Sequence, residues 1–223
     1  METMTVTLLS KKHLAKDVIE CVFGHAGDIN IRPGQYVLVH IGDEWRAFSV
    51  VDIPGGDSIK IVVKYVTNLR ASHYIDNLLI GDEVTIQQPQ GGIEISSDTN
   101  IFFVATGTGI VPCVELARHN LQSGFRRNIT IVFGASDADD LFYRDELNEL
   151  SDKYNNCKVV ITLSRASDEW EGFKGRTIDY IEKNFDTMHD TNFYVCGRKE
   201  TVALIIERLD EMGVPTYRRH FVE

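Results

Sequence analysis

The rhythm of apolar runs changes near residue 97, and this change most constrains the fold. Before it, short β-branched or alternating runs such as QYVLVHI and SIKIVVKYV are separated by turn residues, including Arg32-Pro33-Gly34, residues 53–56 (IPGG) and Gly81-Asp82. Many short strands at this spacing are typical of a sandwich or a small barrel. Only the segment RASHYIDNLL, residues 70–79, indicates a helix in this half.

From residue 100 onward, apolar strands alternate with longer helical patterns. The strand-like segments are NIFFVAT, NITIVFGA, CKVVITLS and TNFYVCG, and the last helical segment ends on Gly213 as a C-terminal cap. This order is typical of a parallel sheet covered by helices. The sequence therefore predicts two domains: an antiparallel Greek-key β-barrel over residues 1–97 and an α/β Rossmann-like parallel sheet over residues 98–223.

Charge and cysteine spacing disfavour several classes of protein. The net charge of −10 disfavours general binding to nucleic acids or anionic membranes. The start, METMTVTLLSKKHLAKD, has no apolar stretch long enough for a signal peptide or a membrane span. The cysteines are far apart, which disfavours a zinc or iron–sulfur site and favours the cytoplasm: Cys21, Cys113, Cys157 and Cys196. We therefore expect a cytoplasmic protein with no nucleic-acid partner, no membrane insertion and no metal.

The segment WRAFSVV places an arginine, an aromatic ring and a hydroxyl on one expected strand. Arg46 and Phe48 share a face of that strand, and Ser49 alternates away. A guanidinium can bind phosphate oxygens at two points, and an aromatic ring can stack on a flat heterocycle. The alternative interpretation is a half-buried strand with an exposed arginine.

Ser72 stands where the short helix of residues 70–79 is expected to begin. As the N-cap it would lie beside free backbone amides, which favour an anion such as a pyrophosphate. The alternative is that Ser72 only caps its own helix.

A glycine turn follows the first strand of the second half. Thr106-Gly107-Thr108-Gly109 would lie at the carboxyl end of that strand, and Pro112 would lie in the first turn of the next helix. Glycine lets the backbone approach a ligand closely, and the helix start aims amides at a diphosphate. A plain tight turn is the alternative.

Two later strand ends are expected at the same edge of the sheet. Ser164 and Arg165 end the third strand, with Arg176 shortly after, and this set suits a phosphate monoester such as the 2′-phosphate of NADPH. Cys196 and Gly197 end the fourth strand, where a small residue lets a ring approach. The alternatives are a solvated charged loop and an ordinary buried cysteine.

Taken in order, these motifs resemble those of the ferredoxin–NADP(+) reductase superfamily. The set is Arg-x-aromatic-Ser, Gly-Asp before a Pro-x-Gly turn, Gly-Thr-Gly-Ile-x-Pro, Ser-Arg with Gly-Arg, and Cys-Gly. The resemblance covers roughly residues 5–223. It implies a six-stranded antiparallel barrel that holds a flavin, FAD by default and FMN as the exception. It also implies a Rossmann-like domain that binds NADPH or NADH.

The resemblance implies a set of flavin-contacting residues in the barrel: Arg46, Ala47, Phe48, Ser49, Lys64, Tyr65 and Ser72. Arg46 would bind the flavin phosphate, Phe48 would stack on the isoalloxazine in place of the family's usual Tyr, and Ser49 would lie near N5. Ser72 would bind the pyrophosphate, although the family's glycine before this serine is Arg70 here.

In the second domain, the resemblance implies a dinucleotide-binding set: Thr106, Gly107, Thr108, Gly109, Pro112, Ser164, Arg165, Arg176, Cys196 and Gly197. The glycine turn would hold the pyrophosphate, Ser164 and Arg165 a 2′-phosphate with Arg176 as a helper, and Cys196 the nicotinamide. The additional arginine of some NADP-dependent members is missing from residues 133–136, and the Pro after Cys-Gly is Arg198. Phe221 is the residue expected to cover the flavin.

The implied activity is that of an FAD-dependent NAD(P)H oxidoreductase. Hydride would pass from the nicotinamide to flavin N5, with Ser49 and Cys196 as the catalytic residues. We expect the electrons to reach a ferredoxin, a flavodoxin or another redox partner. Free flavin, a partner oxygenase or another enzyme is the alternative acceptor, and a non-catalytic nucleotide-binding module is the third hypothesis.

Overall fold

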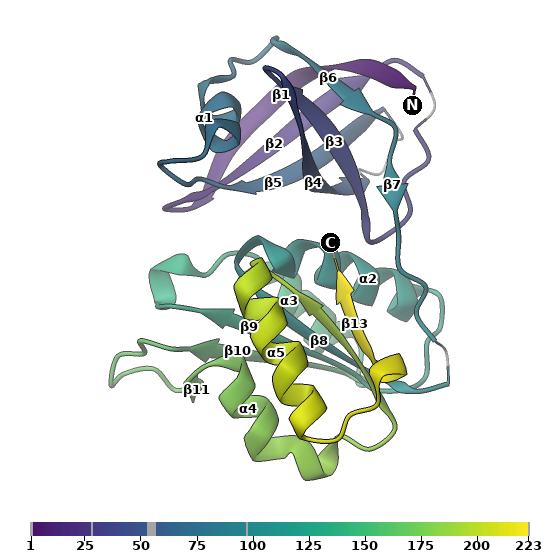
Figure 1. Cartoon of the computed structure of the whole chain (residues 1–223), viewed down its shortest axis with the longest axis vertical. Coiled ribbons are helices and arrows are strands. Elements are labelled where there is room, and N and C mark those ends of the chain that lie inside the picture. The colour runs from purple at the N-terminus through teal and green to yellow at the C-terminus, as the bar shows by residue number, and fades with distance from the viewer. Residues whose placement is uncertain (1, 28, 53–56, 97, 223) are drawn as a thin grey trace. The chain divides into compact units, whose positions relative to one another are not determined.

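The structure is a computed structural model that describes residues 2–27, 29–52, 57–96 and 98–222. The predicted turn at residues 53–56 and the last residue of the predicted first domain, residue 97, lie outside the described residues. The chain divides into two compact units, Met1–Ile93 and Glu94–Glu223, which Figure 1 colours from purple to teal and from teal through green to yellow. Each unit has a hydrophobic core of its own.

The first unit is a closed antiparallel barrel with one short helix (Figure 1). Its elements are β1 (Thr3–Ala15), β2 (Val18–His25), β3 (Gln35–Ile41), β4 (Glu44–Asp52), β5 (Ser58–Lys64), α1 (Arg70–Asn77), β6 (Glu83–Gln87) and β7 (Gln90–Gly91). The strand order is β4-β5-β2-β1-β6-β3-β7, and a further pairing of β4 with β3 closes the barrel. The predicted barrel is confirmed.

Alternation of side chains explains why these segments form barrel strands. Along β3, the buried Val37, Val39 and Ile41 alternate with residues that are more exposed, so one face of the strand lies in the barrel core. The helix α1 adds Ile75 to the same core. The barrel is therefore held together by one continuous apolar cluster.

The second unit has a fully parallel sheet. Its strands are β8 (Asn100–Thr106), β9 (Ile129–Ala135), β10 (Cys157–Leu163), β11 (Phe173–Lys174), β12 (Thr191–Cys196) and β13 (Arg219–Val222). Their order is β11-β10-β9-β8-β12-β13, and every pair is parallel. The predicted Rossmann-like sheet is confirmed.

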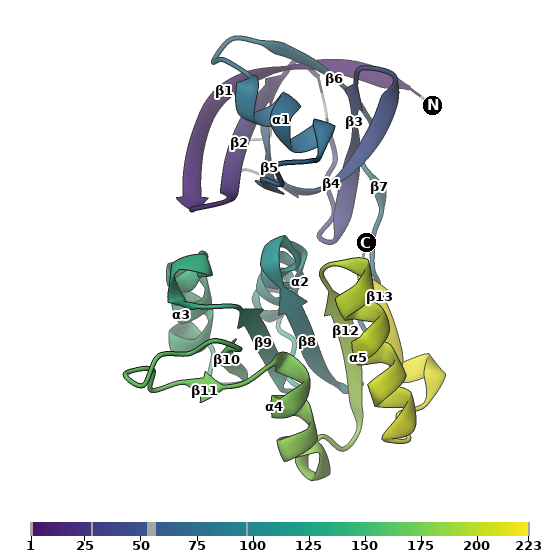
Figure 2. The same cartoon turned by 60° about the vertical axis from the view of Figure 1, so that its left-hand side comes forward.

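Helices cover both faces of this sheet (Figure 2). They are α2 (Ile110–Gln122), α3 (Arg144–Lys153), α4 (Thr177–Asn184) and α5 (Lys199–Glu211), with 3₁₀ turns η1 (Gly107–Gly109), η2 (Ala138–Asp140), η3 (Phe185–Thr187) and η4 (Thr216–Arg218). Helices α4 and α5 pack on one face, where Ile181 and Leu209 join Phe102 and Val104 in one core. Helices α2 and α3 lie on the opposite face.

The short strand β11 was not expected from the sequence, and neither were one helix and the last strand of the second unit. Helix α4 lies within the charged segment after β10, and the C-terminal segment RRHFVE contains β13, which pairs with β12. Over the described residues, no helix has the length and apolar character needed to cross a bilayer. In that part of the chain, no group of three or more His, Cys, Asp or Glu side chains could hold a metal ion.

Candidate functional site

The carboxyl ends of the parallel strands bring the predicted dinucleotide residues to one edge of the sheet. Residues 107–109 follow β8, residues 136–137 follow β9, residues 164–165 follow β10, and Cys196 ends β12 just before Gly197. Because all these strands run in the same direction, their carboxyl ends share an edge. Ligands of open α/β sheets bind outside this edge.

The glycine turn forms as the sequence predicts. Thr106 ends β8, Gly107–Gly109 makes a 3₁₀ turn, and Pro112 lies in the first turn of α2. Gly107 has a φ of +56°, a left-handed conformation that suits glycine. The N-cap of α2 is Gly109, which has no side chain to cap the helix amides. Those amides therefore suit an anion such as a pyrophosphate.

Cys196 lies directly against this turn. A Cβ on Gly109 would stand 2.5 Å from the carbonyl oxygen of Cys196, so only glycine allows this approach. Gly197 packs on Thr106, since a Cβ there would lie 2.2 Å from the Thr106 hydroxyl. These close contacts join the ends of β8 and β12 into one cradle.

A second buried thiol lies beside Cys196, and sequence reasoning missed it. Burial raises the pKa of Cys113, in the first turn of α2, well above its ordinary value, and contact with the Cys196 thiol raises it further. Cys113 therefore stays protonated and packs as a small apolar group. Its position one residue after Pro112 was the available sequence signal.

The loops after β9 and β10 are joined by backbone hydrogen bonds. The Ser164 N–H donates to the Ala135 carbonyl over 3.1 Å, and the Arg165 N–H donates to the Ser136 carbonyl over 2.7 Å. The Arg165 guanidinium also pairs with Asp137, with 3.0 Å between Nη2 and Oδ2. Sequence reasoning missed Asp137, whose signal was its position just after a parallel strand.

Arg176 and Phe221 also lie toward this edge. Arg176 is the N-cap of α4, where its side chain is exposed and its N–H donates to Asp179 Oδ2 over 2.7 Å. Gly134 lets the start of α4 approach β9, because a Cβ there would meet the side chain of the first helical residue. Phe221 lies on β13 beside β12, and 62% of it is exposed.

In the barrel, the predicted flavin residues of WRAFSVV lie on β4. Arg46 is exposed and its guanidinium pairs with Glu44. The Phe48 ring is partly buried and packs against the barrel core, Ala47 is exposed, and Ser49 is half-buried. An exposed ion pair of this kind holds its arginine weakly, so Arg46 can turn to a phosphate.

Lys64 and Tyr65 lie where β5 ends, close to α1. Lys64 is exposed, and the Tyr65 hydroxyl lies 3.1 Å from Nδ1 of His73, which sequence reasoning had not singled out. Arg70 reaches back to the β3–β4 turn and pairs with Asp43 over 2.5 Å. The pKa of Asp43 is lowered, first by a hydrogen bond with its own backbone and then by this guanidinium.

The expectation for the start of α1 is wrong in one respect. Its N-cap is Leu69, and Ser72 lies inside the first turn with only 2% of its surface exposed. The Ser72 hydroxyl accepts the Val66 N–H over 3.1 Å and lies within donating distance of the carbonyls of Val66 and Leu69. Ser72 therefore holds the loop that leads into α1.

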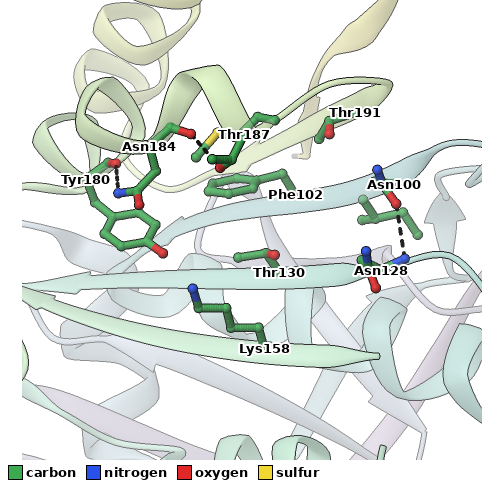
Figure 3. A pocket seen from close by; sticks show the side chains of 11 residues that line it. Asn100, Phe102, Asn128, Thr130, Lys158, Tyr180, Asn184, Thr187 and Thr191 are labelled. Carbon is green, nitrogen blue, oxygen red and sulfur yellow. Dashed lines mark hydrogen bonds between the residues drawn. The ribbon is translucent and has the colours of Figure 1, made fainter. Parts of the chain in front are cut away.

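A small cavity of about 130 Å³ lies at the opposite, amino edge of the same sheet (Figure 3). Lys158, Thr130 and Tyr180 line it, and Asn184 donates to the Tyr180 carbonyl over 2.8 Å. The Lys158 amine lies 6.0 Å from the centre of the Tyr180 ring. No residue of the predicted dinucleotide set lines this cavity. The carboxyl edge is therefore the candidate site.

Comparison with known protein families separates the same two regions. A family described as an oxidoreductase FAD-binding domain matches residues 5–95, and one described as an oxidoreductase NAD-binding domain matches residues 103–206. These matches correspond to the barrel and to the parallel sheet.

Two curated relatives illustrate the similarity. Ferredoxin--NADP reductase B of Sorangium cellulosum (strain So ce56) is 30% identical over 189 residues, which cover 80% of this chain and 77% of that protein. The reductase component of propane 2-monooxygenase of Mycolicibacterium goodii is 27% identical over 200 residues, covering 85% of this chain and 58% of that protein. The chain thus spans little more than half the length of some relatives.

Solved structures share the complete fold. The crystal structure of the Amycolatopsis cytochrome P450 reductase GcoB has a TM-score of 0.90 at 21% identity and covers 100% of this chain and 69% of that chain. The structure of a ferredoxin NADP+ reductase from Neisseria gonorrhoeae, with bound FAD and NADP, has a TM-score of 0.84 at 19% identity. It covers 99% of this chain and 98% of that chain.

Proposed function

Because the chain belongs to the ferredoxin–NADP(+) reductase superfamily and is an FAD-dependent NAD(P)H oxidoreductase, we propose that it delivers electrons to a separate redox protein. That protein is a ferredoxin or a flavodoxin. The observation that carries the proposal is the contact between the glycine turn and Cys196 at the carboxyl edge, which forms a cradle for the hydride donor. The barrel, which matches an FAD-binding domain, holds the acceptor of the hydride.

The cradle at the carboxyl edge binds the dinucleotide pyrophosphate. The turn Gly107–Gly109 brings backbone close to the phosphates, and the amides at the start of α2 donate hydrogen bonds to them. Cys196 and Gly197 border the position of the nicotinamide ring, because they lie at the end of β12 directly beside Gly109. The Cys196 thiol positions the ring.

The barrel residues bind and orient the flavin. Arg46 binds a phosphate through its guanidinium, Phe48 offers a ring face from β4, and Ser49 supplies a hydroxyl near the reacting nitrogen. Lys64 and Tyr65 add contacts from the end of β5, and Ser72 fixes the loop before α1. Bound FAD supplies the chemistry, since it takes up a hydride and can release electrons singly.

Reduction of the purified protein by a nicotinamide dinucleotide tests this function. Protein reconstituted with FAD is expected to be yellow and to lose its flavin absorbance when NADH or NADPH is added without oxygen. Cys196→Ala is expected to slow this reduction at saturating dinucleotide, whereas Cys157→Ala, in the same sheet but at the start of β10, is expected to leave it unchanged. A protein that binds no flavin, or that neither dinucleotide bleaches, contradicts the proposal.

A partner oxygenase is the second candidate acceptor. Relatives that match this chain include reductase components of propane 2-monooxygenase, of anthranilate 1,2-dioxygenase and of terephthalate 1,2-dioxygenase systems. To separate the candidates, reduced protein is mixed with a ferredoxin, with a flavodoxin and with free flavin in separate experiments. The rate of its reoxidation is measured by stopped flow. Fast reoxidation by a ferredoxin or a flavodoxin supports the first choice. Slow reoxidation by all three favours an oxygenase component.

A further inference from the structure

One ion pair lies where the adenosine end of a dinucleotide is expected, at the ends of β9 and β10. Asp137 and Arg165 are 28 residues apart in sequence, yet Oδ2 and Nη2 lie 3.0 Å apart. The two loops are fixed side by side by the backbone bonds from Ser164 to Ala135 and from Arg165 to Ser136. The main chain therefore holds the two residues side by side.

Both members of the pair are accessible to a ligand. The exposed fraction of the Arg165 side chain is 71%, and that of Asp137 is 44%. A carboxylate only accepts hydrogen bonds, and a guanidinium only donates them. A hydroxyl placed beside them can donate to Asp137 and accept from Arg165 at once. A phosphate monoester can pair with Arg165 but has like charge to Asp137.

The charges around the pair favour a ligand hydroxyl over a phosphate monoester. Asp139 and Asp140 follow Asp137 on the turn η2, so the turn after β9 carries three carboxylates. Arg176, the second cation of the sequence motif, is accompanied by a further carboxylate, because Asp179 lies in the first turn of α4 and accepts the Arg176 N–H. A 2′-phosphate carries a charge of about −1.5 to −2 near pH 7, so it would meet net repulsion here.

We propose that Asp137 makes NADH the preferred hydride donor by accepting a hydrogen bond from the 2′-hydroxyl of the adenosine ribose. This inference rests on the proposed function. An acidic residue after the second strand of a dinucleotide-binding sheet commonly makes this contact. Arg165 supplies the complementary donor, and a 2′-phosphate that paired with it would bring its charge against Asp137 at the same point. Asp137 is therefore a specificity residue and takes no part in hydride transfer.

The test compares NADH with NADPH in the FAD-loaded wild-type protein and in two variants. Asp137→Asn removes the charge at the pair, and Asp139→Asn removes the same charge two residues away as a matched control. The wild type is expected to favour NADH in kcat/KM by at least about tenfold. Asp137→Asn is expected to shrink that ratio by about tenfold, mainly through a lower KM for NADPH. Asp139→Asn removes part of the same repulsion but no contact with the ribose, so it is expected to shrink the ratio by about twofold at most.

A binding measurement keeps this inference separate from the proposed function. Calorimetry with adenosine diphosphate ribose, with and without a 2′-phosphate, reports the preference at the adenosine end without any hydride transfer. Tighter binding of the unphosphorylated ligand, lost in Asp137→Asn, supports the inference even if neither dinucleotide reduces the flavin. A wild type that prefers the 2′-phosphate, an unchanged preference in Asp137→Asn, or no binding of either ligand overturns it.

Discussion

Arg46 is the residue of the barrel on which flavin retention is expected to depend most. Its only described partner is the exposed Glu44, so a phosphate can take over the guanidinium at little cost. Arg46→Ala is expected to raise the dissociation constant for FAD by about tenfold to a hundredfold, the usual effect of losing a hydrogen bond to a charged group. Fluorescence titration of the apoprotein with FAD measures the change.

A matched control for Arg46 comes from the other unit. Arg126 is an exposed arginine between α2 and β9, and Arg126→Ala removes the same charge from a residue that is not part of the barrel unit. This variant is expected to bind FAD as the wild type does. Equal FAD affinity of Arg46→Ala and the wild type would refute the assignment of Arg46 to the flavin phosphate.

Cys157 is expected to make the stability of the folded protein fall at alkaline pH. Burial raises its pKa from 9.0 to about 11. Because the folded-state pKa lies above the unfolded value, the stabilisation from the neutral thiol is complete below pH 9 and is lost as the pH rises toward 11. Urea unfolding at pH 8 and pH 10.5 is therefore expected to show a larger loss of stability for the wild type than for Cys157→Ala. Parallel losses in both proteins would contradict this role.

At the scale of elements, the start of α2 depends on a close approach to the end of β12. Gly109 has a φ of −60°, which alanine also adopts, so the cost of Gly109→Ala is purely steric. The new Cβ would lie 2.5 Å from the Cys196 carbonyl oxygen, so the helix start must move. We expect a loss of about 1–3 kcal/mol in stability and weaker binding of the dinucleotide.

Gly213 differs from Gly109, because a substitution there strains the backbone without a steric clash. It has a φ of +81° at the end of α5, and nothing lies within 4 Å of a Cβ built there. Gly213→Ala is therefore expected to cost about 1 kcal/mol through backbone strain alone and to leave dinucleotide binding unchanged. Thermal unfolding and dinucleotide titration of both variants test the difference. Weakened binding in both variants would contradict the steric explanation.

Periodicity revealed most elements of the chain but missed α4 and β13 for physical reasons. Residues such as Val37 and Ile41 alternate with exposed positions, and this local pattern is enough to predict a strand. Helix α4 has Arg176 at its N-cap, where Ser, Thr, Asp or Asn is usual, so the sequence lacks the common start signal. Strand β13 is four residues long and exists because β12 pairs with it. The contact of Asp137 with Arg165 depends on tertiary structure in the same way.

At the scale of the whole molecule, ligand binding is expected to stabilise the barrel. The tryptophans Trp45 and Trp170 lie in different units, so Trp170→Phe leaves a fluorescence signal from the barrel alone. Free FAD at about 100 times its dissociation constant is expected to add about 2.7 kcal/mol to the free energy of unfolding of the barrel. Riboflavin, which has no phosphate for Arg46, is expected to add less at the same concentration. Equal effects of the two flavins would contradict a phosphate contact.

The backbone bonds from Ser164 and Arg165 to the loop after β9 have a consequence for how this protein can evolve. They hold the edge where we propose that the adenosine end binds, and they do so with main-chain atoms, which every substitution except proline preserves. Side chains at this edge can therefore change without loss of the scaffold that presents them. Evolution or protein engineering could therefore change the preference between NADH and NADPH by altering a few exposed positions, while electron transfer through the flavin is retained.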